Sequence, residues 1–151
     1  MKPIVINTGH VNIPIKNHLG EDLGTISINP NDFNIIHRSS DGFDQISKLE
    51  KEITELFDPE HVDISDKLVK AKIKEIDDRI KQIVDFIFDS NVSKTVFKNT
   101  SCITMINTGK EVKPFVLVLL DALMPTIKEI VNKNSVIDRD KVNKVKGKYI
   151  P

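Results

Sequence analysis

Cysteine and aromatic residues are scarce in this chain of 151 residues, which has one cysteine, one tyrosine and no tryptophan. A single cysteine excludes a disulfide within the chain and a zinc site built from cysteine pairs, and it fits a reducing compartment. Because aromatic residues make up only 5% of the chain, we expect an aliphatic core in which isoleucine and valine dominate.

Surplus charge and long apolar runs are also missing. Basic and acidic residues both number 22, a balance that argues against nucleic acid or a membrane as a partner attracted by bulk charge. The most hydrophobic window, FVLVLLDALM at 115–124, is about half as long as a membrane span and contains Asp121. Polar residues at 7–10 interrupt the first apolar run, which does not resemble a signal peptide. We therefore expect a cytoplasmic protein with no membrane partner.

Known catalytic and metal-binding patterns do not occur either. The chain contains no G-x-S-x-G elbow and no phosphate-binding loop. Its four histidines lack metal-binding spacing, and NPNDFN at 29–34 lacks the central glycine of a calcium loop. Adjacent Asp77 and Asp78 would not face each other on a helix, and we expect them to be solvated.

Cys102 lies among apolar and hydroxyl residues, with no neighbouring base to activate it. We expect it to be a small buried hydrophobic residue. An enzyme would need a pocket that brings polar side chains together. Such a pocket would contain at least two of four candidate residues: Asp32, His37, His61 and Cys102. The sequence gives no spacing that brings them together, so we predict no enzyme, no catalytic residue, no metal and no cofactor.

Residues 4–29 have the pattern of β-structure. Short runs rich in isoleucine and valine stand at 4–6, 11–15 and 23–28, and the last two alternate with polar residues. Pro14 cannot donate a ladder hydrogen bond, which predicts an edge strand, and Gly20 can take a positive φ in the intervening turn. Asn29 to Asp32 should end the last strand and cap a helix.

The remainder of the chain has helical periodicity. After short turns at 32–38 and a connector at 39–42, a helix is predicted at 43–57 and a longer one at 64–88, and the two should form an antiparallel hairpin. The second helix has a heptad-like seam, which could also mediate self-association: Val69, Ile73, Ile76, Ile80, Ile83 and Ile87. A short helix is expected at 92–97, strand or irregular structure at 99–109 with a turn at Thr108-Gly109, and a last helix from Pro114 that Pro125 should kink or split.

The sequence thus predicts an α+β protein in which a small N-terminal antiparallel β-unit precedes a mainly helical body with an antiparallel helical hairpin. We expect a single domain over 1–151. It comprises a β-unit at 1–29, a helical part at 30–132 and a basic tail at 133–151.

Three stretches together are similar to one protein family: LGEDLGTISINPNDFNIIHR, the charged helical middle from KLEKEITELF to KIKEIDDRIKQIVDFIFD, and KPFVLVLLDALMPTIKEI with its lysine-rich end KGKY. Their order resembles the tail assembly chaperones of long-tailed bacteriophages that infect Gram-positive bacteria. The chain departs from that group around 101–112, where related proteins carry a glycine-centred segment. The resemblance implies a non-enzymatic protein of the host cytoplasm that binds the tape-measure protein and keeps it soluble during tail assembly.

If the resemblance holds, helix-in-groove binding is the expected mode of contact. The candidate groove-lining residues are Phe86, Phe88, Phe115 and Leu119, although each could instead be a core residue. The candidate partner-facing charges are Lys144, Lys146 and Lys148. Nucleic acid is not the expected partner of this tail, because it lacks interleaved aromatic and arginine residues. The alternative function is a small phage protein that binds and inhibits, or signals to, a host defence or regulatory protein.

Overall fold

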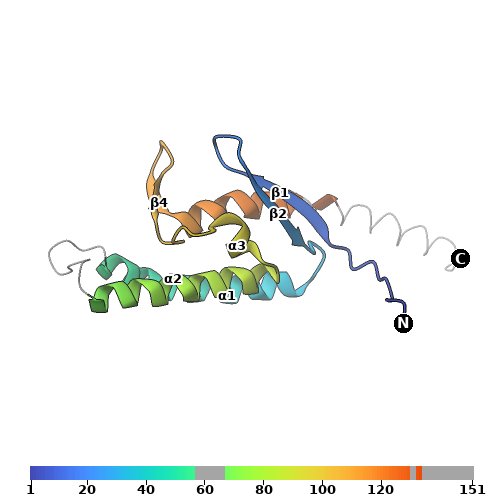
Figure 1. Ribbon diagram of the computed structural model, residues 1–151, viewed down its shortest axis with the longest axis horizontal. Helices are drawn as coiled ribbons and strands as arrows, with labels where there is room; N and C mark the ends of the chain where they lie inside the picture. The colour runs from blue at the N-terminus through green and yellow to red at the C-terminus, as the bar shows by residue number, and fades with distance from the viewer. Residues whose placement is uncertain (57–66, 130–131, 134–151) are drawn as a thin grey trace, which may run out of the picture.

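The computed structural model describes residues 1–56, 67–129 and 132–133 and confirms the α+β class (Figure 1). In chain order the elements are β1 (Val11–Lys16), β2 (Asp22–Ile28), α1 (Asn34–Leu56), α2 (Lys67–Phe88), α3 (Val92–Val96), β3 (Met105–Asn107), β4 (Val112–Pro114) and a helix at 115–129. The strands form two separate antiparallel pairs, β1 with β2 and β3 with β4.

The first hairpin forms where the alternating pattern predicts it. Val11 pairs with Ile28 and Ile13 with Ile26, and Ile26 and Ile28 are both buried. In the turn, the side-chain oxygen of Asn17 accepts hydrogen bonds from the backbone N–H groups of Leu19 and Glu21, each at 3.0 Å. Gly20 has a φ of 83°, which confirms its predicted role.

The strand predicted at 4–6 is wrong, because no described strand pairs with these residues. Residues 1–6, here called the arm, extend from the body with Ile4, Val5 and Ile6 exposed by 88%, 91% and 73%. An elbow at residues 7–10 sets the direction of the arm. Asn29 Nδ2 donates to the carbonyl of Thr8 at 2.8 Å, and Gly9 has a φ of 77°. This local turn directs the arm away from β1, so the arm cannot continue the sheet.

The passage from β2 into α1 follows the prediction. Asp32 Oδ1 accepts a hydrogen bond from the N–H of Asn34 at 2.9 Å and so caps the first turn of α1. Arg38 donates to Asp32 Oδ2 at 3.0 Å and to the carbonyl of Ile87 at 3.1 Å, which joins this cap to the end of α2. The N–H of Asn34, and then Arg38, lower the pKa of Asp32.

The short turns predicted at 32–38 and the connector predicted at 39–42 are wrong as separate elements, because residues 34–42 belong to the continuous helix α1. Local propensity alone favours a turn at Ser39, Ser40, Asp41 and Gly42. Tertiary contact with α2 favours the helix instead. A Cβ at Gly42 would overlap Ile87 Cγ1 and Cδ1 and lie 3.3 Å from Ile83 Cγ2. Glycine is therefore the residue that lets α1 and α2 cross this closely.

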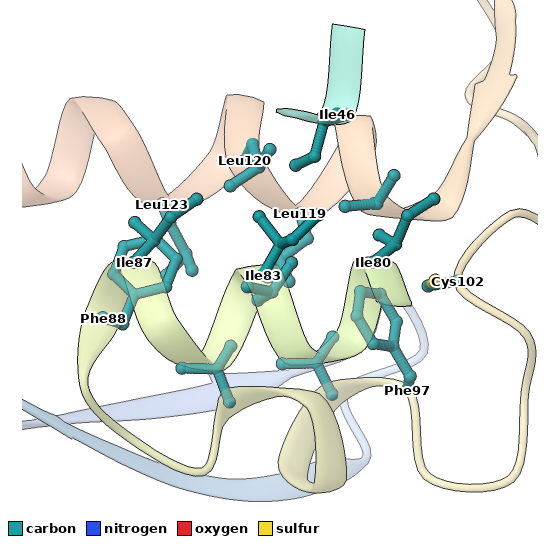
Figure 2. Packing of buried hydrophobic residues seen from close by; sticks show 14 of the residues in the cluster. Ile46, Ile80, Ile83, Ile87, Phe88, Phe97, Cys102, Leu119, Leu120 and Leu123 are labelled. Carbon is teal, nitrogen blue, oxygen red and sulfur yellow. The ribbon is translucent and has the colours of Figure 1, made fainter. Parts of the chain in front are cut away.

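The predicted seam of α2 is the centre of the core. Ile76, Ile80 and Ile87 are fully buried and Ile83 nearly so, while Val69 and Ile73 pack against them. Figure 2 shows Leu119, Leu120 and Leu123 of helix 115–129 pointing toward this side of α2. Because the chain covers the seam itself, the seam is not available for self-association.

Helix 115–129 runs through Pro125 without a break, so the predicted split is wrong. Pro125 lies on the exposed side of this helix.

Two aspartates of α2 fasten the segment that carries α3. Asp85 accepts hydrogen bonds from the N–H and hydroxyl of Ser93 at 2.8 and 2.6 Å. Asp77 accepts from the N–H of Cys102 at 2.7 Å and forms an ion pair with Lys81 at 3.0 Å. The expectation that Asp77 is solvated is therefore wrong, although Asp78 is exposed. The helix predicted at 92–97 is confirmed as α3.

The second hairpin lies between Cys102 and helix 115–129. Met105 pairs with Pro114 across it, and the predicted turn at Thr108-Gly109 is confirmed by a φ of 87° at Gly109. The N–H of Phe115 donates to the carbonyl of Thr104 at 2.8 Å, so β4 leads directly into the helix. No helix within the described residues is both long and apolar enough to span a membrane.

Candidate protein-binding groove

An open apolar groove of about 460 Å³ lies between α1 and the second hairpin. One wall is a face of α1, and the other comes from β3, β4 and the start of helix 115–129. We call it the α1 groove, and it is lined by Phe43, Ile46, Ser47, Glu50, Ile53, Thr54, Met105, Pro114, Val116 and Leu117. Its volume is within the usual range of ligand-binding pockets, about 300–1,000 Å³.

The groove exists because the second hairpin covers this face of α1 only partly. Ile46, Ile53 and Val116 are buried and form its floor. Phe43 and Leu117 are half-buried against the core, and Met105 is 45% exposed. From Phe43 to Thr54 the α1 wall extends for about 17 Å, or roughly three helical turns. An apolar surface of this length matches the contact face of a short helix or an extended segment.

The electrostatics of the groove are simple. Glu50 is the one charged residue among the described lining residues. The hydroxyl of Thr54 donates to the carbonyl of Glu50 at 3.0 Å and is thus used within α1. Such a lining can hold apolar side chains and attract one positive charge at its edge.

Two further hollows are smaller and differ in character. One, of about 330 Å³, lies between the start of α1 and helix 115–129 and is lined by Ile35, Ile36, Ser39, Met124, Ile127, Lys128 and Asn132. The other, of about 310 Å³, crosses α1 and α2 and is lined by Gln45, Arg79, Gln82, Ile83 and Phe86. The charged lining residue of each is a cation, in contrast to Glu50 in the α1 groove.

The predicted contact residues have different locations. Phe86 is 49% exposed and lines the hollow of α1 and α2. Phe88 and Leu119 are only 2% and 6% exposed and belong to the core (Figure 2), so as the structure stands neither lines a groove. Phe115 is half-buried, with its ring edge-on to Phe97 at 4.9 Å between centroids. The predicted lysines Lys144, Lys146 and Lys148 lie outside the described residues.

Of the four residues that the sequence offered for an enzyme pocket, the structure describes Asp32, His37 and Cys102. Asp32 caps α1 and pairs with Arg38, and His37 is exposed. Cys102 is fully buried, as predicted, and burial together with the nearby Asp77 raises the pKa of its thiol far above the usual range. His61 lies outside the described residues. Within the described part of the chain, no group of three or more potential metal ligands comes together.

Sequence reasoning missed the residues that line the α1 groove. Ile46, Leu49 and Ile53 follow helical spacing, and Phe43 stands three residues before Ile46, so helical periodicity could have identified Phe43. Met105 and Leu117 carry no comparable signal. They reach the groove only because the second hairpin folds back toward α1.

Comparisons of the chain with protein-family models, with curated proteins and with solved structures give no match.

Proposed function

We propose that this protein is a tail assembly chaperone of a long-tailed bacteriophage, and that it holds a helical segment of the tape-measure protein in the α1 groove. The observation that carries the proposal is the groove itself, an apolar surface about three turns long that the described part of the chain leaves uncovered. The layout of the three sequence stretches supports the same function.

The physical basis is the match between the groove and an amphipathic helix. A tape-measure protein is a long helical chain with apolar seams that aggregate when exposed. Such a seam can place side chains at spacings of three and four residues against Phe43, Met105 and Leu117. Glu50 at the edge favours a lysine or arginine beside the seam. Contacts of this kind are reversible, as release during tail assembly requires.

Phe86 supplies a second contact in this proposal. Aromatic residues that are exposed beside a hollow are frequent anchors of protein interfaces, and Phe86 meets both conditions. Phe88 and Leu119 are left out because they are buried in the core. Lys144, Lys146 and Lys148 remain predicted charge contacts.

The direct test is co-expression with the tape-measure protein encoded in the same genome. The chaperone should keep that protein in the soluble fraction and be recovered with it in a pull-down. Met105→Glu places a charge in the α1 groove and should abolish recovery. Val112→Glu is a matched control, because Val112 lies on the same hairpin, is 58% exposed and does not line the groove.

The proposal fails if the tape-measure protein is equally insoluble with and without this chain and none is recovered. Gene order separates it from the alternative, a small phage protein that binds a host defence or regulatory protein. A chaperone gene should lie between the gene for the major tail protein and a very long tape-measure gene.

A further inference from the structure

The arm is the most exposed apolar segment of the described residues. Three consecutive β-branched side chains, Ile4, Val5 and Ile6, are exposed by 73–91%, so they contact almost nothing in their own chain. The elbow that carries them is nevertheless held by the bond from Asn29 to Thr8. Figure 1 shows the arm extending away from the body. Contiguous apolar surface of this kind usually marks an interaction site.

We infer that the arm of a second copy of this chain occupies the α1 groove, and that a tape-measure helix must displace it to bind. The self-association is independent of the proposed function. The displacement rests on the proposed function, since it assigns the same groove to the tape-measure helix.

Charge selects the α1 groove among the three hollows. The arm carries one charged side chain, Lys2, directly before its apolar residues. The charged lining residue is Lys128 in one hollow and Arg79 in another, and both would repel Lys2. In the α1 groove it is Glu50, which would attract Lys2. The apolar wall of Phe43, Met105 and Leu117 then suits the side chains of Ile4 and Ile6.

Reach selects a second copy rather than the same chain. The elbow is tied to Asn29, just before α1 begins. Glu50, the residue that would attract Lys2, lies about 24 Å further along the axis of α1 from Asn34, whereas the six residues of the arm span at most about 22 Å when fully extended. Figure 1 also places the arm at the opposite end of the molecule from β4, which borders the groove.

A reciprocal exchange of arms between two copies would bury both arms and fill both α1 grooves. Two copies related by a twofold axis would each insert an arm into the groove of the other, which doubles the apolar surface buried by one arm. Strand addition to β1 is a poorer use of the arm, because Pro14 offers no N–H at that edge.

The first experiment measures the mass of the full chain in solution by light scattering from micromolar to millimolar concentration. The expected species is a dimer, with twice the 17.1 kDa of one chain. The arm variant Ile4→Ser/Ile6→Ser and the groove variant Met105→Glu should each be monomeric. Mixing the two should restore a heterodimer, because one intact arm meets one intact groove. Leu19→Ser removes another exposed apolar side chain, outside the arm and the groove, and should remain dimeric.

A monomeric wild-type chain throughout this range, or a dimer that survives the arm substitutions, would overturn the inference. We expect these variants to fold, because Ile4 and Ile6 are exposed and Met105 is half-exposed. Loss of the dimer would then report loss of the contact and not unfolding. Circular dichroism of each variant checks this point.

Disulfide trapping then identifies the contact. Chains with Val5→Cys mixed with chains with Met105→Cys should form a covalent heterodimer under mild oxidation, whereas Leu19→Cys with Met105→Cys should not. The native Cys102 is fully buried and does not compete. A bond formed only within one chain that carries both Val5→Cys and Met105→Cys would show that the arm occupies its own groove and would refute the exchange.

Binding of the tape-measure protein separates the two proposals. If nine-tenths of the grooves are occupied by arms, the arm variant should bind that protein about tenfold more tightly than the wild type. Tight binding with no difference between them would refute the displacement and leave the proposed function intact. Self-association without any tape-measure binding would refute the proposed function and leave the exchange intact.

Discussion

The two faces of α1 meet their surroundings in opposite ways. Toward α2, the helix approaches so closely that a Cβ at Gly42 would overlap Ile87. Toward the second hairpin, the same helix leaves the α1 groove of about 460 Å³ open. The closed face contributes its apolar burial to folding, whereas the open face still exposes apolar surface that a partner can bury. One helix thus combines a folding surface with the surface that we propose as a binding site.

The largest effect is expected on the closed face. Gly42→Leu should lower the free energy of unfolding by about 3 kcal/mol, because the new side chain has to displace Ile83 and Ile87 from a filled core. Urea unfolding followed by circular dichroism measures the change. Asp41→Ala, at an exposed neighbouring position, should shift the midpoint little. Equal stability of Gly42→Leu and wild type would show that the two helices do not cross this closely.

A smaller loss is expected where α2 fastens the Cys102 segment. Asp77→Ala leaves the buried N–H of Cys102 without its 2.7 Å partner, and the expected cost is about 2 kcal/mol. Asp78→Ala changes the adjacent, exposed aspartate and serves as the control, with an expected change below about 0.5 kcal/mol. If both substitutions cost the same, Asp77 is solvated after all.

The pH dependence of stability tests the same contact between Asp77 and the Cys102 segment. Partial burial alone would raise the pKa of Asp77, but the hydrogen bonds from Cys102 and the pairing with Lys81 outweigh burial and hold the pKa below its usual 3.8. The stabilisation is therefore fully present above about pH 3.8 and is lost as the pH falls through the lower pKa of the folded state. The stability difference between wild type and Asp77→Ala should narrow in that acidic range. A difference that grows on acidification would contradict this sign.

The smallest effect on stability is expected on the open face. Met105→Glu should change the free energy of unfolding by less than about 1 kcal/mol, because Met105 is 45% exposed. The same substitution should abolish the proposed self-association and the proposed binding of the tape-measure protein. Thermal unfolding together with the mass and pull-down measurements tests whether stability and binding separate. A large loss of stability would make the groove part of the core instead.

Local patterns predicted much of the fold. The alternation around Ile26 and Ile28 marked the first hairpin, and the seam of Ile76, Ile80, Ile83 and Ile87 marked α2 and the centre of the core. Both patterns are read from residues a few positions apart, where strand and helix geometry determine which side chains share a face. The Asn29–Asp32 passage was predictable for the same reason, since a cap acts within one helical turn.

The wrong predictions concern segments whose structure depends on distant residues. The run at 4–6 has strand composition but is directed away from the sheet by an elbow tied to Asn29. Residues 39–42 have turn composition but are helical where Gly42 meets Ile87. The α1 groove joins α1 to residues around Met105 and Leu117, and no spacing along the chain could predict that meeting.

The sequence by itself determined the hairpin, the seam of α2 and the aliphatic character of the core, because backbone geometry converts short-range spacing directly into shared faces. Only the tertiary structure decided that α1 is continuous, that Asp77 is a structural anchor and that one face of α1 stays open. These features depend on which surfaces far apart in the sequence come into contact, and on how close they come. Close packing of the core determines both the contacts and their distances.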